Sequence, residues 1–224
     1  MDNTILTALS AIAAQQSAPT NQTLAEVTQF LDYMASHEEA IITYHASDMV
    51  LAVHSDASYL NAPNARSRVG GYHFLSNDTA DPPTNGPVLT VAQILKHVVT
   101  SAAEAEIGGL FVNAKAAVPE RHTLVEMGHN QPATPMQTDN TTASDILTKK
   151  VQPKRTKSMD MRFHWLRDRG CQQNFRFYWR PGHSNKGDYY TKHHSGAHHK
   201  ATRPALFTAP AVLRALRARL TNQT

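Results

Sequence analysis

Four acidic residues occupy short segments that are spread in order along the chain. The segments are residues 54–58, 101–106, 137–140 and 187–189, and the acids are Asp56, Glu106, Asp139 and Asp188. Hydrolysis of a phosphodiester by two metal ions requires oxygen ligands that hold both ions close together. Mg²⁺ takes hard oxygen ligands and keeps some of its waters, so a few carboxylates suffice. The four acids therefore predict a site for two divalent cations, provided that the fold brings them together.

Each acid taken singly has a simpler interpretation as a helix cap or a surface carboxylate. Glu104 illustrates this, because it lies three residues after Ser101 in a capping-box sequence. We assign Glu104 to capping and Glu106 to metal binding. Asp145 and Asp160 are interpreted as surface acids.

The elements expected to hold the four acids are strand ends and helix starts. A strand over 49–54 delivers Asp56 at its end, and a strand over 136–138 ends at Asp139. A helix from 101 to about 118 carries Glu106 one turn in, and a helix over 186–194 carries Asp188 near its start. Helix N-termini favour negative charge, which helps to assemble several carboxylates in one place.

Apolar periodicity predicts the remaining elements. We expect strands over 41–44, over 67–76 with a bulge or bend at Gly70-Gly71, and over 175–179. Residues 88–99 are ambiguous between strand and helix. Helices are expected over 24–36 after a capping box at Thr23, over 141–148 and over 158–169. A last amphipathic helix is expected over 204–220, with Val212, Leu213, Leu216 and Leu220 inward and Arg214, Arg217 and Arg219 outward.

Charge is unevenly distributed over the 224 residues. Residues 1–148 hold 5 Lys+Arg against 15 Asp+Glu, whereas residues 149–224 hold 17 against 3. A basic part beside an acidic part suits a protein that grips a polyanion and gathers cations, and the alternative is a solvated basic face. The chain has no apolar run long enough to span a membrane and no basic segment typical of a signal peptide. The single Cys171 excludes an intramolecular disulfide and fits a reducing compartment.

Basic side chains follow the Asp139 segment and are interleaved with aromatic ones, which favours nucleic acid as the partner. Trp165, Tyr178 and Trp179 could stack on sugar or base, although core packing is the better interpretation for at least two of them. The candidate phosphate contacts are Lys149, Lys150, Lys154, Arg155, Lys157, Arg162 and Arg180.

The chain resembles the ribonuclease H region at the end of copia-class LTR retrotransposon polyproteins, together with the tail of the reverse-transcriptase connection before it. The matching stretches cover roughly residues 6–200. They are residues 30–33, 44–59 (YHASDMVLAVHSDASY), 65–75, 101–110 (SAAEAEIGGL), 137–140, 153–169 (PKRTKSMDMRFHWLRDR) and 177–194 (FYWRPGHSNKGDYYTKHH).

This resemblance implies the ribonuclease H fold, a mixed five-stranded sheet with helices on its faces. It implies Mg²⁺- or Mn²⁺-dependent cleavage of the RNA strand in an RNA–DNA hybrid by two ions held on Asp56, Glu106, Asp139 and Asp188. His183 lies where many members carry a mobile histidine that helps the product to leave. The implied organisation is a mostly helical connection remnant over 1–45, a ribonuclease H-like domain over 46–200 and a C-terminal helix over 201–224, in an intracellular protein of the cytoplasm or nucleus.

The sequence departs from this family in two places. An acidic-aromatic pair usually follows the first strand, whereas this chain has Ser58-Tyr59, and no reverse-transcriptase catalytic motif is present. The alternative is a catalytically silent nucleic-acid-binding or interaction module left from a decayed element. An integrase of related fold is excluded, because that site needs a late glutamate and the chain has none after Glu126.

Overall fold

The computed structural model describes residues 2–148 and 161–207, and the chain divides into two compact units. The larger unit is Ala46–His193. The smaller unit joins both ends of the chain, Met1–His45 and His194–Thr224.

The larger unit is a mixed α/β structure. Its strands are β1 (Val50–Ala62), β2 (Arg66–Ser76), β3 (Pro87–Ile94), β4 (Thr134–Thr138) and β5 (Phe175–Trp179). Its α-helices are α3 (Ala102–Glu126), α4 (Thr141–Thr148) and α5 (Met161–Cys171). Short 3₁₀ helices are η2 (Pro63–Ala65), η4 (Gly182–Ser184) and η5 (Lys186–Tyr190).

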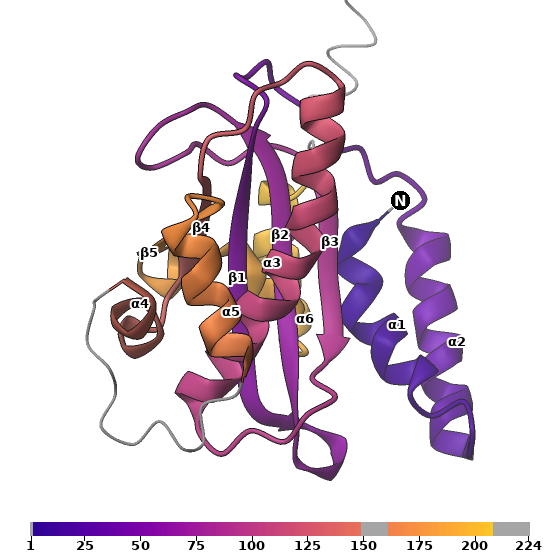
Figure 1. The fold of residues 1–224 in the computed structure, drawn as a ribbon. Coiled ribbons are helices and arrows are strands. Elements are labelled where there is room, and N and C mark those ends of the chain that lie inside the picture. The colour runs from indigo at the N-terminus through magenta and orange to yellow at the C-terminus, as the bar shows by residue number, and fades with distance from the viewer. Residues whose placement is uncertain (1, 149–160, 208–224) are drawn as a thin grey trace, which may run out of the picture. The chain divides into compact units, whose positions relative to one another are not determined.

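The five strands form one sheet in the order β3-β2-β1-β4-β5. β1 pairs antiparallel with β2, and β2 pairs antiparallel with β3. β4 runs parallel to β1, and β5 runs parallel to β4. The helix α3 lies between β3 and β4 in the chain and crosses the sheet (Figure 1). A mixed five-stranded sheet flanked by helices, the architecture expected of a ribonuclease H-like fold, is thus confirmed.

The two faces of the sheet bury different side chains, because alternate residues of a strand point to opposite sides. Leu51 and Val53 of β1 belong to the main apolar core, which lies on the side of the sheet that carries α3, α4 and α5. His54 of β1 faces the other way and contacts the rings of Tyr72 and Phe74. The segment η5 covers this second face, where the ring of Tyr190 stacks on Tyr72. The buried apolar residues on the α3 side include Ile107, Leu110, Met136, Phe163, Leu166 and Phe175.

Two adjacent glycines in β2 let neighbouring elements approach the sheet closely. A Cβ on Gly70 would lie 2.1 Å from the carbonyl oxygen of Gly187 in η5, and a Cβ on Gly71 would lie 1.9 Å from Oδ1 of Asn113 in α3. The expected bulge at these glycines is wrong, because Gly70 pairs in regular register with Asp56. The glycines therefore serve packing on both faces of β2.

A buried polar network fixes α3 against β1 and β2. Asn113 Nδ2 donates to Ser55 Oγ (2.9 Å), to the Gly70 carbonyl (3.0 Å) and to the Gly109 carbonyl (3.1 Å). Its Oδ1 lies 3.2 Å from Nε2 of His73, whose Nδ1 lies 2.7 Å from a carboxylate oxygen of Glu120. Leaving any of these buried polar groups without a partner would raise the free energy of the folded state. The network therefore favours one placement of α3 along the sheet.

The smaller unit is helical in its described part. It contains η1 (Asn3–Ile5), α1 (Leu6–Ala13), α2 (Asn21–Ser36), α6 (Gly196–Thr202) and η6 (Arg203–Ala205). Thr20 and Thr23 cap α2 reciprocally, so the expected N-cap at Thr23 is wrong by one turn. Thr20 is the better cap because its extended backbone lets its hydroxyl accept from the Thr23 amide.

Several expected element boundaries are corrected by the structure. Residues 41–44 are not a strand, β1 extends eight residues past His54 to Ala62, and α3 continues through Pro119 to Glu126. The expected helix over 186–194 is only the short η5. The expected helix over 204–220 lies mostly outside the described residues. None of the described helices combines the length and the apolar character needed to cross a lipid bilayer.

Gly70→Ala should destabilise the larger unit by about 1–3 kcal/mol, since the added methyl group meets backbone that cannot rotate away. Urea unfolding followed by circular dichroism measures the loss. Gly170→Ala is the matched control, because a Cβ there makes only van der Waals contact, 3.5 Å from the Phe177 ring. Equal stability of the two variants would contradict the close approach of η5 to β2.

Candidate active site

Three of the four expected acids converge in the larger unit. Asp56, Glu106 and Asp139 each offer a carboxylate oxygen, and the three oxygens lie within 4.8 Å of one another. Asp56 and Glu106 are each only 5% exposed, and Asp139 is half-buried. Asp56 lies within β1 and not at its end, contrary to expectation, whereas Asp139 directly follows β4 as expected. The parallel pairing of β1 with β4 sets these two residues side by side.

The start of α3 carries Glu106 to the two aspartates. Ser101 caps the helix by accepting from the Glu104 amide, and the Glu104 carboxylate accepts from the amide and hydroxyl of Thr100 (2.7 and 2.8 Å). The assignment of Glu104 to capping is therefore consistent with its contacts. Gly109, one turn later, packs against Ala57, since a Cβ there would lie 3.1 Å from that of Ala57. Glu106 consequently reaches β1.

Backbone and hydroxyl donors orient the Glu106 carboxylate. Its Oε1 accepts from the Ala57 amide (3.2 Å), and its Oε2 accepts from the Thr138 hydroxyl (3.4 Å). Asp139 is held through its backbone, because Trp179 Nε1 donates to the Asp139 carbonyl (2.8 Å). The Asp139 side chain stays available to the cluster.

Asp188 lies beside the three carboxylates but outside their closest group. Its charge acts on both Asp56 and Asp139, so the four acids share one region of the larger unit. Asp188 Oδ1 accepts a 2.6 Å hydrogen bond from Lys192 Nζ, four residues later. Burial lowers the pKa of Lys192, but the bond to Asp188 and the surrounding carboxylates outweigh burial and raise it.

The carboxyl groups are hard to ionise together. Burial, and after it the charges of Asp139 and Asp188, raise the pKa of Asp56 to about 7. Burial and the neighbouring aspartates raise the pKa of Glu106 well above its usual range. Burial and Asp188 also raise the pKa of Asp139. Desolvation and mutual repulsion both disfavour the charged forms.

The donor set fits a hard divalent cation. Three carboxylates converge, and a cation placed among them would offset both their repulsion and their loss of hydration. Asp56, Glu106 and Asp139 would be its ligands, with Asp188 at the rim. All the donors are oxygens, which suits Mg²⁺ or Mn²⁺ better than a softer metal.

The other expected site residues fall in different places. His183 is exposed in η4 and lines a cavity of about 490 Å³ together with His54, Arg180 and Lys186. Burial, and after it the charge of Lys186, lower the pKa of His54 to about 4. Arg180 pairs with Asp81 at 2.9 Å. The remaining candidate phosphate contacts, Lys149, Lys150, Lys154, Arg155 and Lys157, lie outside the described residues.

The three aromatic residues considered for stacking on nucleic acid differ in their burial and contacts. Trp165 packs in the core against the rings of Phe111 and Phe175. Tyr178 is half-buried under the Arg176 guanidinium, whereas Trp179 is exposed beside Asp139. Arg162 is half-buried in α5.

The sequence interpretation missed Thr138 and Lys192. Thr138 carries no signal in the sequence, because its contact with Glu106 joins residues 32 apart. Lys192 did carry one, since a lysine four residues after an aspartate is a recognisable ion-pair spacing on a helical turn.

The raised carboxyl pKa values predict how the stability of the metal-free protein depends on pH. Between the unfolded pKa near 3.8 and the folded value of about 7, the native state binds more protons at Asp56, so stability falls as pH rises. Asp56→Asn removes this penalty and should raise Tm by several degrees at pH 8, given roughly 2–4 °C per kcal/mol for a chain of this size.

The gain from Asp56→Asn should shrink toward pH 4, where the wild-type carboxyl is protonated in the native state and partly so in the unfolded state. Scanning calorimetry in EDTA at both pH values measures it. Asp145→Asn, an exposed acid on α4, is the control and should change Tm little at either pH. A gain that does not depend on pH would show that Asp56 is not held in a repulsive, desolvated position.

The comparisons with known proteins agree with the geometry in part. No model of a known protein family matches the chain. The chain is 24% identical over 166 residues to the retrovirus-related Pol polyprotein from transposon TNT 1-94 of Nicotiana tabacum. This alignment covers 74% of the chain but only 12% of the polyprotein, so the chain corresponds to a small part of that protein.

Solved structures that are similar in fold are ribonucleases H of low sequence identity. LC11-RNase H1, isolated from compost, is 12% identical with a TM-score of 0.47, over 64% of this chain and 93% of that one. The N-terminal RNase H domain of rv2228c from Mycobacterium tuberculosis is 14% identical with a TM-score of 0.42, over 63% and 95%. The strand order β3-β2-β1-β4-β5 gives the larger unit a ribonuclease H-like fold, and the chain is similar to part of a retrotransposon Pol polyprotein.

Proposed function

We propose that this chain is a ribonuclease H that uses two divalent cations, Mg²⁺ or Mn²⁺, to cleave the RNA strand of RNA–DNA hybrids. The observation that carries the proposal is the convergence of Asp56, Glu106 and Asp139 within 4.8 Å on a mixed five-stranded sheet. The similarity to a transposon Pol polyprotein supports an origin in an LTR retroelement of the copia class. A protein of this kind would act inside the cell, in the cytoplasm or nucleus.

Some residues of the chain would bind the metal ions, and others would bind the nucleic acid. Asp56, Glu106 and Asp139 would ligate the cations, and Asp188 would complete the set from η5. When bound there, the ions supply an activated water and stabilise the leaving oxygen. The Ala57 amide and the Thr138 hydroxyl donate to Glu106 and keep its carboxylate turned toward the aspartates. The carboxylate would therefore need little reorganisation when it binds a cation.

Several side chains around the acids are suited to a nucleic-acid backbone. The Lys192 ammonium is exposed next to Asp188 and offers a positive charge to a phosphate. Trp179 presents an exposed ring beside Asp139, against which a sugar or base could stack. A hybrid duplex is recognised through its backbone and 2′-hydroxyl groups and not through its base sequence, which fits this set. His183 lies one residue from Gly182, which packs against Asp139, and could assist product release.

Asp139→Asn should reduce cleavage by at least about a hundredfold while leaving hybrid binding nearly unchanged. It removes a metal-ligating charge but keeps the shape of the side chain, so the loss falls on the chemical step. The assay uses labelled RNA–DNA hybrid, duplex RNA and duplex DNA with Mg²⁺, and binding is measured separately in Ca²⁺. Asp145→Asn, exposed on the helix that follows, is the matched control and should cleave at the wild-type rate.

Each outcome of this assay separates the proposal from the silent-module alternative. Cleavage of hybrid alone, lost in Asp139→Asn, supports the ribonuclease H function. Wild-type protein that binds hybrid but cleaves none of the three substrates would instead identify a silent binding module. Wild-type cleavage by Asp139→Asn would place the metal site elsewhere.

Hybrid binding should weaken as salt rises, because basic side chains displace counterions from phosphates. The log–log slope should be about −0.7 to −0.9 per phosphate neutralised. Changing Lys154 and Arg155 together to Ala should flatten this slope and weaken all sequences alike, since phosphate contacts carry no base information. Fluorescence anisotropy on hybrids of two compositions measures both effects. An affinity independent of salt, or a loss confined to one sequence, would contradict backbone binding by this segment.

A further inference from the structure

The cavity of about 490 Å³ that His183 helps to line is separate from the metal site. His54 of β1 and Gln137 of β4 form its base, and these two residues are register partners in the parallel pair of strands. Its walls come from residues 81–84 of the loop between β2 and β3 and from the segment over 180–186, which contains η4. None of the three converging carboxylates lines it.

Hydrogen bonds hold the loop between β2 and β3 in place as a wall of this cavity. Arg176 of β5 donates from Nη2 to the carbonyls of Thr79 (3.2 Å) and Ala80 (3.1 Å). At the other end of the loop, Tyr72 Oη of β2 donates to the Asn85 carbonyl (2.8 Å). The loop is therefore tied to strands on two sides. Because the wall is already ordered, a ligand would not have to bear the entropic cost of ordering it.

The base of the cavity carries a hydrogen-bond donor that no described residue accepts. His54 is 4% exposed, and its Nδ1 lies 3.2 Å from the Lys186 amide nitrogen. A backbone amide can only donate, so Nδ1 accepts and the neutral ring carries its proton on Nε2. Within the part of the chain that the structure describes, this Nε2–H has no acceptor. Since the ring lines the cavity, a ligand there can accept this hydrogen bond.

Positive charge is in excess around the cavity. Apart from histidines, its ionisable side chains are Asp81, Arg180 and Lys186. Asp81 accepts from Arg180 Nε (3.3 Å) and pairs with its Nη2 (2.9 Å), which offsets one positive charge. The Lys186 ammonium has no acidic partner among the described residues, and its charge acts on the His54 ring. An unpaired cation next to a free N–H donor favours an anionic ligand that has several acceptor oxygens.

We propose that this cavity binds a phosphate group, carried either by a nucleotide or by a nucleic-acid backbone. The phosphate oxygens would accept from His54 Nε2 and pair with the Lys186 ammonium. Arg180 Nη1, which takes no part in the pair with Asp81, offers further donors. The remaining lining includes Pro82, Pro83 and His183, which leaves room and apolar surface for an attached sugar or base.

This inference is independent of the proposed nuclease function, because none of the expected metal ligands lines the cavity. Binding can therefore be measured in EDTA, without metal ions that would bridge phosphate to the carboxylates. If the nuclease proposal fails, phosphate binding can still be present, and the converse also holds.

Titration of the ¹⁵N-labelled full chain with inorganic phosphate in EDTA, followed by NMR chemical shifts, tests the site. The Lys186 and Ser184 amides should shift. Lys186→Gln should weaken binding at least about tenfold, since it removes a charge-assisted contact. Lys115→Gln is the matched control, because Lys115 is an exposed lysine on α3 that does not line the cavity, and it should bind as the wild type does.

Asp81→Asn should have the opposite effect and tighten phosphate binding about threefold. It removes the negative charge of an exposed ion pair and leaves the Arg180 charge for the ligand. Asp145→Asn on α4 changes the net charge equally and should leave the affinity unchanged. Loss of fold can only weaken binding, so opposite effects of the two cavity variants exclude it. No shift in the wild type at about 10 mM phosphate, or control variants that change as much as the cavity variants, would overturn the proposal.

Two further measurements identify what carries the phosphate. If the site takes a backbone phosphate, Lys186→Gln should weaken hybrid binding and reduce the log–log salt slope by about 0.7 to 0.9. If it takes a nucleotide, adenosine 5′-monophosphate should bind more tightly than inorganic phosphate and should not displace the hybrid. A protein that binds inorganic phosphate but shows neither behaviour would overturn the proposal, since its site would then be one for small inorganic anions only.

Discussion

The larger unit is organised around one electrostatic cost, the placement of three mutually repelling carboxylates in a largely buried position. Asp56, Glu106 and Asp139 approach within 4.8 Å, and burial raises the pKa of all three. A fold selected for stability alone would place such acids apart and in water. Their convergence is therefore the feature that most strongly indicates a functional site, and the surrounding structure has to hold it together.

The structure offsets this cost by fixing the elements that carry the acids. Central β1 pairs on both sides and cannot shift without moving every side chain to the other face. Asn113 ties α3 to β1 and β2 through three donated hydrogen bonds, seven residues after Glu106. Gly70, on the same strand pair as Asp56, lets η5 approach and bring Asp188 to the rim. The free energy of the apolar core and of this network holds the carboxylates in place.

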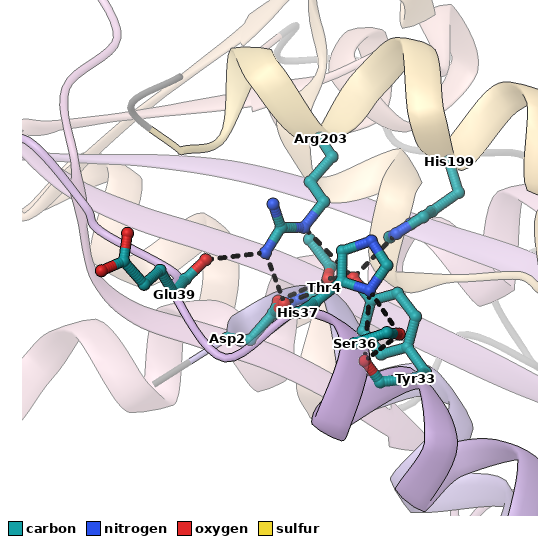
Figure 2. Close-up of polar contacts among 8 residues, drawn as sticks. All are labelled: Asp2, Thr4, Tyr33, Ser36, His37, Glu39, His199 and Arg203. Carbon is teal, nitrogen blue, oxygen red and sulfur yellow. Dashed lines mark hydrogen bonds and ion pairs between the residues drawn. The ribbon is translucent and has the colours of Figure 1, made fainter. Parts of the chain in front are cut away.

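Acidic and basic residues are also unevenly distributed along the chain. The acidic N-terminal residues and the basic C-terminal ones belong to one unit, and Arg203 joins them through Asp2 and Tyr33 (Figure 2). Electrostatic pairing in this unit involves partly buried groups and a tyrosine hydroxyl, so solvent screens it less than a surface ion pair. The smaller unit thereby connects two ends of the chain that sequence alone assigns to separate segments.

The sequence by itself determined the fold class, the types of the main elements and the acids that converge. Strand and helix periodicity located β4, α4 and β5 closely, because short amphipathic runs bounded by polar residues have clear limits. Only the tertiary structure decided that Asp56 lies inside a long β1, that Gly70 and Gly71 serve close packing, and that Thr138 and Lys192 support the acids. These features depend on contacts between residues far apart in the chain, or on the space around the backbone. Short-range sequence patterns contain no information about either. The pairing of Thr138 with Glu106, 32 residues away, exists only once β4 and α3 have packed on β1.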